Sequence, residues 1–175
     1  MRIGLARRLV LLCGVVALPT VQAMAAVNAY MTIEGSTQGS IKGGSERAGG
    51  WAGTFPLTGV VRGPDEPRDA ATGMASGKRQ HSVITITRKM DAASPKLARA
   101  AATGESLRQV TIVFETPGGV AGKEKVAQKI VLSDAIIAGI RNTGETETIK
   151  LAFQKIEVTY VNGNKTSTDD WETPK

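Results

Sequence analysis

The chain has 175 residues and a formal net charge of +6, with 22 basic residues, 16 acidic residues and one histidine. This length predicts one folded domain with a single core. The only cysteine, Cys13, lies near the N-terminus, so the remainder of the chain is excluded from forming disulfides or thiolate metal sites.

The first 25 residues have the pattern of a secretory signal peptide. Three arginines at positions 2, 7 and 8 precede an apolar run at 9–18, and Ala-Met-Ala at 23–25 supplies an A-x-A cleavage pattern. The apolar run is too short to span a bilayer, so we expect no stable membrane insertion. Removing this segment leaves 19 basic residues against 16 acidic ones, a formal charge of +3. So small a charge does not indicate a nucleic-acid partner.

The segment after the leader begins with a strand and continues into a glycine-rich loop. Ala29, Met31 and Ile33 alternate with polar residues within 27–33, which predicts a first strand. Residues 35–53 are loop-like and contain six glycines from position 39 onward. A second strand is predicted at 55–61, where Pro56 places it at a sheet edge or a bulge. A second glycine-rich stretch follows at 63–77.

The centre of the chain predicts a strand that leads directly into the one helix. Residues 83–87 are all β-branched, with Ile84 and Ile86 on one face. Ser94 is the expected N-cap, and Pro95 is the expected first helical residue. A narrow apolar stripe follows, and Gly104 stands where a left-handed C-cap is expected. The stripe consists of Leu97, Ala100 and Ala101.

The last third of the chain predicts only strands. Alternating apolar residues mark strands at 109–115, 126–132, 135–141 and 147–161. Within the last strand, the apolar residues change phase by one position near Gln154-Lys155, which predicts a bulge that turns the chain around a closed barrel. The expected fold is therefore mainly β: a small antiparallel barrel with one helix packed outside it. Residues 162–175 are expected to be a polar tail.

No group of residues predicts catalysis or cofactor binding. His81 is the only histidine, so it has no second imidazole with which to share a metal. Two glycine-rich segments ending at Lys78 and Lys123 are each one residue shorter than a phosphate-binding loop, and both lead into strands. No serine lies in a G-x-S-x-G turn. We therefore expect no enzyme activity, no cofactor and no metal.

Four motifs, in order along the chain, resemble the hemolysin-coregulated protein (Hcp) family, the tube protein of type VI secretion systems. The resemblance extends over about 29–160. Its motifs are AYMTIEG at 29–35 with QGSIKG at 38–43, PRDAATG at 67–73 with GKRQH at 77–81, DAASPKL at 91–97 and FQKIEVTY at 153–160.

The resemblance implies a ring-forming barrel with a structural role in secretion. Family members assemble as hexameric rings that stack into a tube, work with the sheath and spike of the secretion machine, and carry or chaperone small effectors. We expect two loops to contact neighbouring subunits, through Lys42, Arg47 and Trp51 in the first and Arg68 and Arg79 in the second.

The signal peptide leaves two interpretations open. Either residues 1–25 are a cleaved leader and the protein is exported, or translation starts at Met24 and the protein is cytoplasmic before ejection. In both, 26–161 forms the Hcp-like domain. An exported barrel of this fold could instead act as a ligand- or effector-binding module, independent of a secretion machine.

Overall fold

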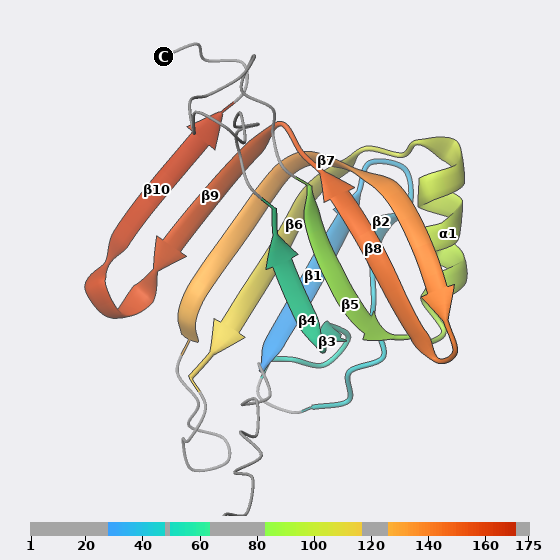
Figure 1. Ribbon diagram of the computed structural model, residues 1–175, viewed down its shortest axis with the longest axis horizontal. Helices are drawn as coiled ribbons and strands as arrows, with labels where there is room; N and C mark the ends of the chain where they lie inside the picture. Colours follow the sequence, from blue (N-terminus) through green and yellow to red (C-terminus); the bar gives the residue numbers. More distant parts are fainter. Residues whose placement is uncertain (1–27, 48–49, 64–82, 117–125, 171–175) are drawn as a thin grey trace, which may run out of the picture.

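The computed structural model describes residues 28–47, 50–63, 83–116 and 126–170 (Figure 1). The expected leader and the second glycine-rich stretch therefore lie outside the described residues, apart from Gly63. The described part holds ten strands, one α-helix and one 3-10 helix: β1 (Ala29–Gly35), β2 (Gly39–Ile41), β3 (Phe55–Leu57), β4 (Gly59–Arg62), β5 (Ile84–Lys89), α1 (Ser94–Thr103), β6 (Leu107–Glu115), β7 (Val126–Thr143), β8 (Thr146–Ala152), β9 (Lys155–Tyr160), η1 (Val161–Gly163) and β10 (Lys165–Asp170).

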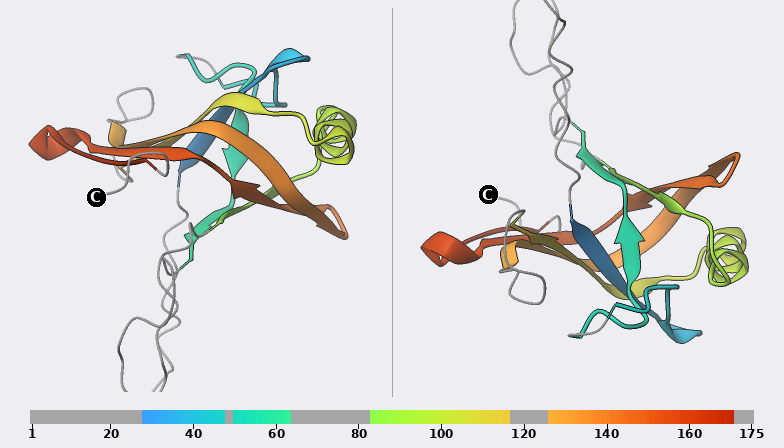
Figure 2. Two further views of the ribbon diagram at one scale, coloured as in Figure 1. Left: turned by 90° about the horizontal axis from the view of Figure 1, so that it is seen from above. Right: turned by 90° about the horizontal axis from the view of Figure 1, so that it is seen from below.

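All pairings among these strands are antiparallel, and they follow the order β2-β1-β6-β7-β8-β5-β4. The β9–β10 hairpin pairs with β7, and β3 pairs with β1. Helix α1 lies at one side of the molecule and the β9–β10 hairpin at the opposite side (Figure 2). The prediction of a mainly β fold with one helix is confirmed.

The predicted closed barrel is not formed by a continuous ladder of hydrogen bonds. Among the described strands, the hydrogen-bonded path begins at β2 and ends at β4 without closing. The predicted second strand is in fact two strands, because β3 pairs with β1 whereas β4 pairs with β5. Pro56 lies on β3, which pairs only with β1 and is therefore an edge strand, as predicted for a residue without an N–H to donate. The segment 55–62 therefore spans the gap between the two ends of the sheet.

One long strand belongs to both halves of the sheet, where we predicted two strands. Strand β7 pairs with β9 through Ser133 and with β8 from Ile136 onward. Asp134, between them, has a left-handed φ of 49°. The predicted change of phase is confirmed, but as a two-residue interruption between β8 and β9 instead of a bulge within one strand. Ile149 and Ile156, on its two sides, are both 1% exposed.

The core lies between the two halves of the sheet and the helix. Strand alternation places one apolar face of each central strand inward, as predicted for β1, β5 and β6. The largest fully buried apolar side chains come from nine elements: Met31, Ile33, Ile41, Phe55, Ile84, Ile86, Leu97, Leu107, Ile112, Leu132 and Ile149, with Ile156 at 1% exposure.

Helix α1 buries the predicted stripe but begins differently from the prediction. Leu97 and Ala100 are fully buried. Ala93 is the N-cap and makes no side-chain capping bond, so the expected Ser94 cap is wrong. The Ser94 hydroxyl instead binds buried charged groups, described below. Gly104 is the C-cap with φ 63°, as predicted, and the Glu105 N–H donates to Ala100 O at 2.9 Å.

Two further strands were absent from the prediction. The first loop contains β2, which pairs with β1, and the polar segment after Asn162 contains β10, which pairs with β9. Both consist mostly of exposed residues, so neither shows an apolar pattern that would indicate a strand. None of the described helices has the length and apolar character needed to cross a membrane.

The Gly104 conformation gives a stability prediction. Gly104→Ala should lower the free energy of unfolding by about 1 kcal/mol, because a Cβ is disfavoured at positive φ even though nothing lies within 4 Å of it. The control is Gly139→Ala, where φ is not positive and the Cβ also meets nothing within 4 Å. Urea unfolding measures both variants, and an equal loss in the two would contradict the role of φ.

Candidate functional site

Two of the predicted interface residues meet at the base of the first loop. Arg47 Nη1 lies 2.8 Å from Glu115 Oε2 and donates to the Tyr30 hydroxyl. Trp51 stacks on Tyr30 with ring centroids 4.7 Å apart and 26° between the planes. We call Tyr30, Arg47, Trp51 and Glu115 the Tyr30 cluster. It joins the loop to β1 and to the end of β6.

The two charged side chains of the Tyr30 cluster differ in their exposure to solvent. The Glu115 side chain is 2% exposed, whereas the Arg47 side chain is 30% exposed. The hydrogen bonds to Tyr30 and Glu115 raise the pKa of Arg47 further above its ordinary range, so it remains charged. Arg47 therefore neutralises a buried carboxylate, while its own side chain remains partly exposed to solvent.

The other predicted interface residues lie apart from this cluster or outside the described residues. Lys42 is exposed, and its side chain runs past Gly53, so that a Cβ added at Gly53 would lie 3.7 Å from it. Backbone bonds close the loop beside it: Gly43 N donates to Gly53 O at 2.8 Å, and Gly53 N to Ser45 O at 2.8 Å. Arg68 and Arg79 lie outside the described residues, so their placement stays a prediction.

A network of buried charged side chains joins β5, β8 and the start of α1. Arg88 on β5 is 1% exposed, and its Nη2 lies 2.7 Å from Glu147 Oε2 on β8 and 2.7 Å from Ser94 Oγ on α1. Its Nη1 makes an ion pair at 2.9 Å with Asp91 Oδ2, without hydrogen-bond geometry. The guanidinium carbon lies 4.9 Å from the centre of the Phe55 ring. We call Arg88, Asp91, Ser94 and Glu147 the Arg88 network.

Asp91 connects the Arg88 network to the loop. Its Oδ1 accepts from Ala93 N at 2.8 Å, and its Oδ2 accepts from Gly44 N at 2.8 Å. Burial by itself raises the pKa of Asp91, but Arg88 and these two backbone donors outweigh it and hold the pKa below its ordinary value of 3.8. The carboxylate is therefore ionised near neutral pH, and it binds the first loop to the start of the helix.

A second carboxylate, Glu105, holds the turn between β1 and β2. Its Oε1 accepts from Thr37 N at 2.7 Å and Gln38 N at 2.8 Å, and its Oε2 accepts from Gln38 Nε2 at 2.8 Å. Gly35 is required beside it, because a Cβ there would lie 2.5 Å from Glu105 Oε1. Burial raises the Glu105 pKa, but these donors lower it more, so that it lies below 4.5.

Sequence reasoning did not single out Arg88, Glu105 or Glu147 as buried charged residues. A signal for two of them was present. Arg88 is in phase with Ile84 and Ile86, and Glu147 is in phase with Ile149, so alternation places both charges on the core face. For Glu105 no comparable signal exists, because it lies between elements.

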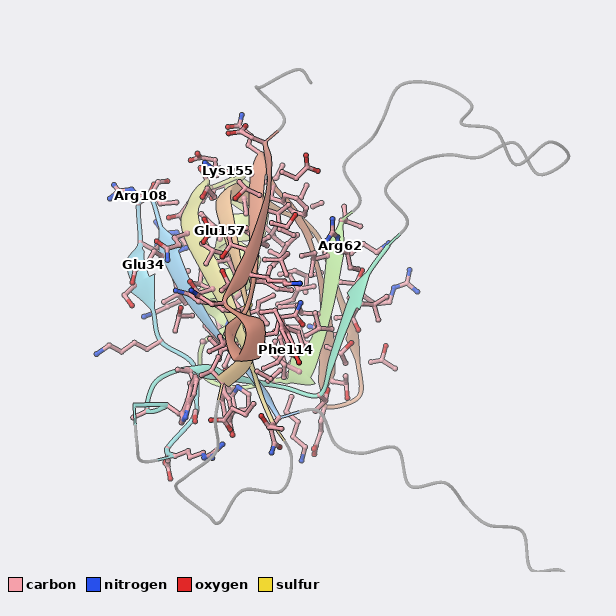
Figure 3. All side chains as sticks on the ribbon, turned by 90° about the vertical axis from the view of Figure 1, so that its left-hand side faces the viewer. Glu34, Arg62, Arg108, Phe114, Lys155 and Glu157 are labelled. Atoms are coloured by element: carbon pink, nitrogen blue, oxygen red, sulfur yellow. The ribbon has the colours of Figure 1, made fainter. Side chains whose placement is uncertain are left out.

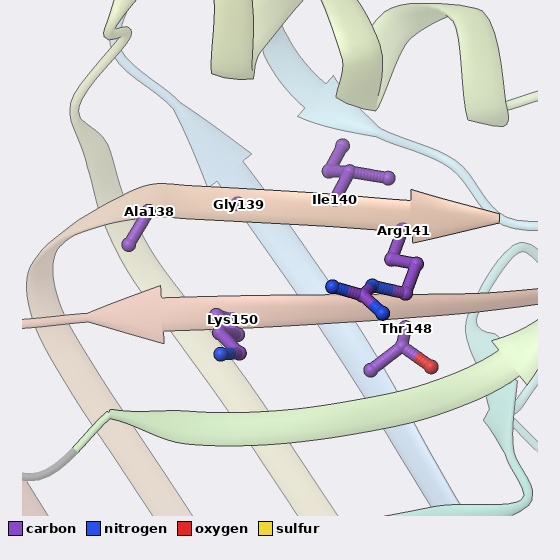
Figure 4. Close-up of a pocket in the computed structure, with 6 residues that line it drawn as sticks. All are labelled: Ala138, Gly139, Ile140, Arg141, Thr148 and Lys150. Carbon is purple, nitrogen blue, oxygen red and sulfur yellow. The ribbon is translucent and has the colours of Figure 1, made fainter.

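A shallow depression of about 490 Å³ lies on the outer surface of β7 and β8 (Figure 4). Arg141 and Lys150 flank it, and Thr148 lines it between them. Across the described residues, no three histidine, cysteine or acidic side chains come together as a metal site. His81 lies outside the described residues.

Comparison with known proteins identifies relatives along nearly the whole domain. The family model described as "Type VI secretion system effector, Hcp" matches residues 30–160. The "Major exported protein" of Pseudomonas aeruginosa is 29% identical over 169 residues, which cover 85% of this chain and 98% of that protein.

Solved structures show the same fold. The Hcp1 protein of E. coli EAEC 042, solved as a mutant, has a TM-score of 0.74 at 24% identity, covering 83% of this chain and 99% of that one. The secreted protein Hcp3 from Pseudomonas aeruginosa has a TM-score of 0.67 at 28% identity, covering 82% of this chain and 99% of that one.

The Arg88 network predicts a large effect from one neutral substitution. Glu147→Gln should lower the free energy of unfolding by about 3 kcal/mol, because it removes the carboxylate that offsets a buried guanidinium. Glu145→Gln, in the neighbouring hairpin turn, removes the same charge from an exposed site and should change it by less than about 0.5 kcal/mol. Denaturant unfolding measures both; similar losses would show that the network does not carry this stability.

Glu105 predicts how stability changes in acid. Since its folded-state pKa lies below the ordinary 4.5, the unfolded chain takes up its proton first, and stability falls as pH drops below about 4.5. In Glu105→Gln, the loss of stability just below pH 4.5 should be smaller than in the parent. The loss at lower pH, to which Asp91 contributes, should remain. Thermal unfolding of both proteins from neutral pH to strong acid measures this pH dependence. If the variant and the parent lose stability equally, Glu105 is not the group responsible.

Proposed function

Because the chain belongs to the Hcp family of type VI secretion proteins, we propose that it is a subunit of the inner tube, forming hexameric rings that stack. The observation that carries this proposal is the family match over residues 30–160. It runs from β1 to the end of β9 and therefore includes nearly every strand of the barrel. Ring assembly fits a domain whose described part shows no metal cluster but several exposed polar loops.

The first loop is the surface that we assign to contact between subunits, through Lys42, Arg47 and Trp51. Arg68 and Arg79 would add contacts from the second loop. Three constraints support this assignment: the loop is closed by its own backbone bonds, braced by Asp91 at Gly44, and joined to β1 by the Tyr30 cluster. The described part of the loop is held at these points, so it should lose little entropy on association. It presents the exposed Lys42 and the half-buried Arg47 from a constrained backbone.

The proposed destination is outside the cell, with the secretion sheath, the spike and small effector proteins as partners. Two relatives support export by their names, "Major exported protein" and "Secreted protein Hcp3". The leader-like segment at 1–25 offers a second route of export, separate from the type VI machine. If it is cleaved by the general export pathway, the chain acts beyond the inner membrane, and the exported binding module becomes the competing function.

Native mass spectrometry of the protein from its own host tests the function, with cells and medium analysed separately. We expect six subunits in both fractions and a chain that starts at Met24 or just after it. A monomer that starts near Ala26, found in the medium alone, would replace the tube subunit with the exported binding module. A processed hexamer would keep the ring and place its assembly beyond the inner membrane.

The same measurement tests the assigned contact surface. Lys42→Glu should reduce the hexamer population at least about tenfold, since it reverses a charge at the proposed contact. Lys165→Glu is the matched control, because Lys165 is also exposed but lies on β10, far along the chain from the loop. Both variants should unfold at the same temperature as the parent. Equal loss of hexamer in both would contradict the contact assigned to the first loop.

A further inference from the structure

One outer wall of the barrel carries only positive charge. It is formed by β4, β5, β8 and residues 136–143 of β7, whose inward side chains fill the core. The only acidic residue in these four segments is Glu147, and it is buried against Arg88. Glu145 lies in the turn beyond the strand ends. We call the outward side chains of this wall the cationic face; the ones used below are Val61, Lys89, Ile136, Arg141, Thr148 and Lys150.

Three cations of the cationic face, Lys89, Arg141 and Lys150, have no ion-pair partner among the described residues. Lys89, Arg141 and Lys150 are exposed, and none of them takes part in a salt bridge or side-chain hydrogen bond of the described part of the chain. Arg141 pairs in register with Thr148, so Lys150 is its diagonal neighbour. Figure 4 shows both cations beside the depression on β7 and β8. Two such cations at a hollowed surface favour an anionic partner.

The rest of the face points to a polypeptide. Val61 is 63% exposed on β4, and Ile136 is 44% exposed on β7, so apolar side chains stand on both sides of the cations. The four segments contain no aromatic residue, and base stacking on aromatic rings is the usual means of holding single-stranded nucleic acid. A mixture of apolar and cationic side chains is typical of a surface that binds an acidic protein segment.

A second copy of this chain is a poor match for the face. The opposite wall, on β1, β6, β9, β10 and the first part of β7, carries both signs of charge: Glu34, Glu157 and Asp170 as well as Lys129 and Lys155. Lys155 lies 3.8 Å from Asp170 and so already neutralises one of the acids. Figure 3 shows Glu34 of β1 and Arg62 of β4 on opposite sides of the molecule, with Lys155 and Glu157 between them. The acidic partner is therefore expected to be a different polypeptide.

We propose that the cationic face binds an extended acidic polypeptide segment, with carboxylates on alternate residues. Diagonal neighbours on paired strands are about 7–8 Å apart. Alternate side chains of an extended chain are about 7 Å apart, so two carboxylates separated by one residue match Arg141 and Lys150. The intervening residue faces away, and apolar residues farther along the segment meet Val61 or Ile136. The surface belongs to one subunit, so this binding does not depend on the ring proposed above.

Fluorescence anisotropy tests the proposal with the full chain and a labelled peptide of alternating glutamate and serine. We expect binding that weakens as NaCl is raised to about 0.15 M, where the screening length is about 8 Å. The double variant Arg141→Gln/Lys150→Gln should bind about tenfold more weakly, since each exposed ion pair contributes about a two- to fivefold factor. A peptide of alternating glutamine and serine should not bind.

The matched control is Lys129→Gln/Lys165→Gln, which removes the same charge from exposed positions outside the cationic face and should bind within about twofold of the parent. Equal weakening in both double variants would overturn the proposal, since the net charge and not the face would then be responsible. A single-stranded oligonucleotide that displaces the peptide at equal concentration would also overturn it. So would a shift in oligomeric state caused by the first double variant with unchanged peptide affinity, or no binding at all.

Discussion

The guanidinium of Arg88 is the constraint on which the arrangement of this molecule depends. Arginine stays protonated in a protein interior, so a fully buried guanidinium requires partners that offset its lost hydration. Those partners come from separate segments: Glu147 from β8, Ser94 from the first residue of α1, and Asp91 from the turn before it. Satisfying one charge therefore positions β5, β8 and the helix relative to one another, and Asp91 extends the constraint to Gly44 in the first loop.

The shape of the barrel follows from two places where strand pairing changes partner. At Asp134 the long strand β7 passes from β9 to β8, and at Thr58 the chain passes from β1 to β5. These changes divide one sheet into two walls whose outward residues differ. One wall carries both signs of charge, whereas the other has its single carboxylate turned inward toward Arg88. The Arg88 network thus keeps the one carboxylate of these segments away from the cationic face.

The two surfaces assigned to association differ in how they are held. The first loop has little regular structure of its own, yet backbone bonds, the Tyr30 cluster and Asp91 hold it at several points. The cationic face is a sheet surface, in which the strand register sets the spacing between charges. Both present charge from an ordered backbone. A constrained backbone allows a surface to bind a partner without first ordering its contacts.

Several local elements were predictable from short-range signals in the sequence. Alternation indicated the inward faces of β1, β5 and β6, Gly104 marked the end of the helix, and the change of phase at Gln154-Lys155 marked the passage from β8 to β9. Features that depend on distant partners were not predictable in this way. Ser94 lost its expected capping role because Arg88 and Glu147 bind its hydroxyl, and β2 and β10 are strands only because β1 and β9 offer them an edge. Hydrogen bonds and ion pairs between segments far apart in the chain leave no periodic pattern, so only the folded molecule shows them.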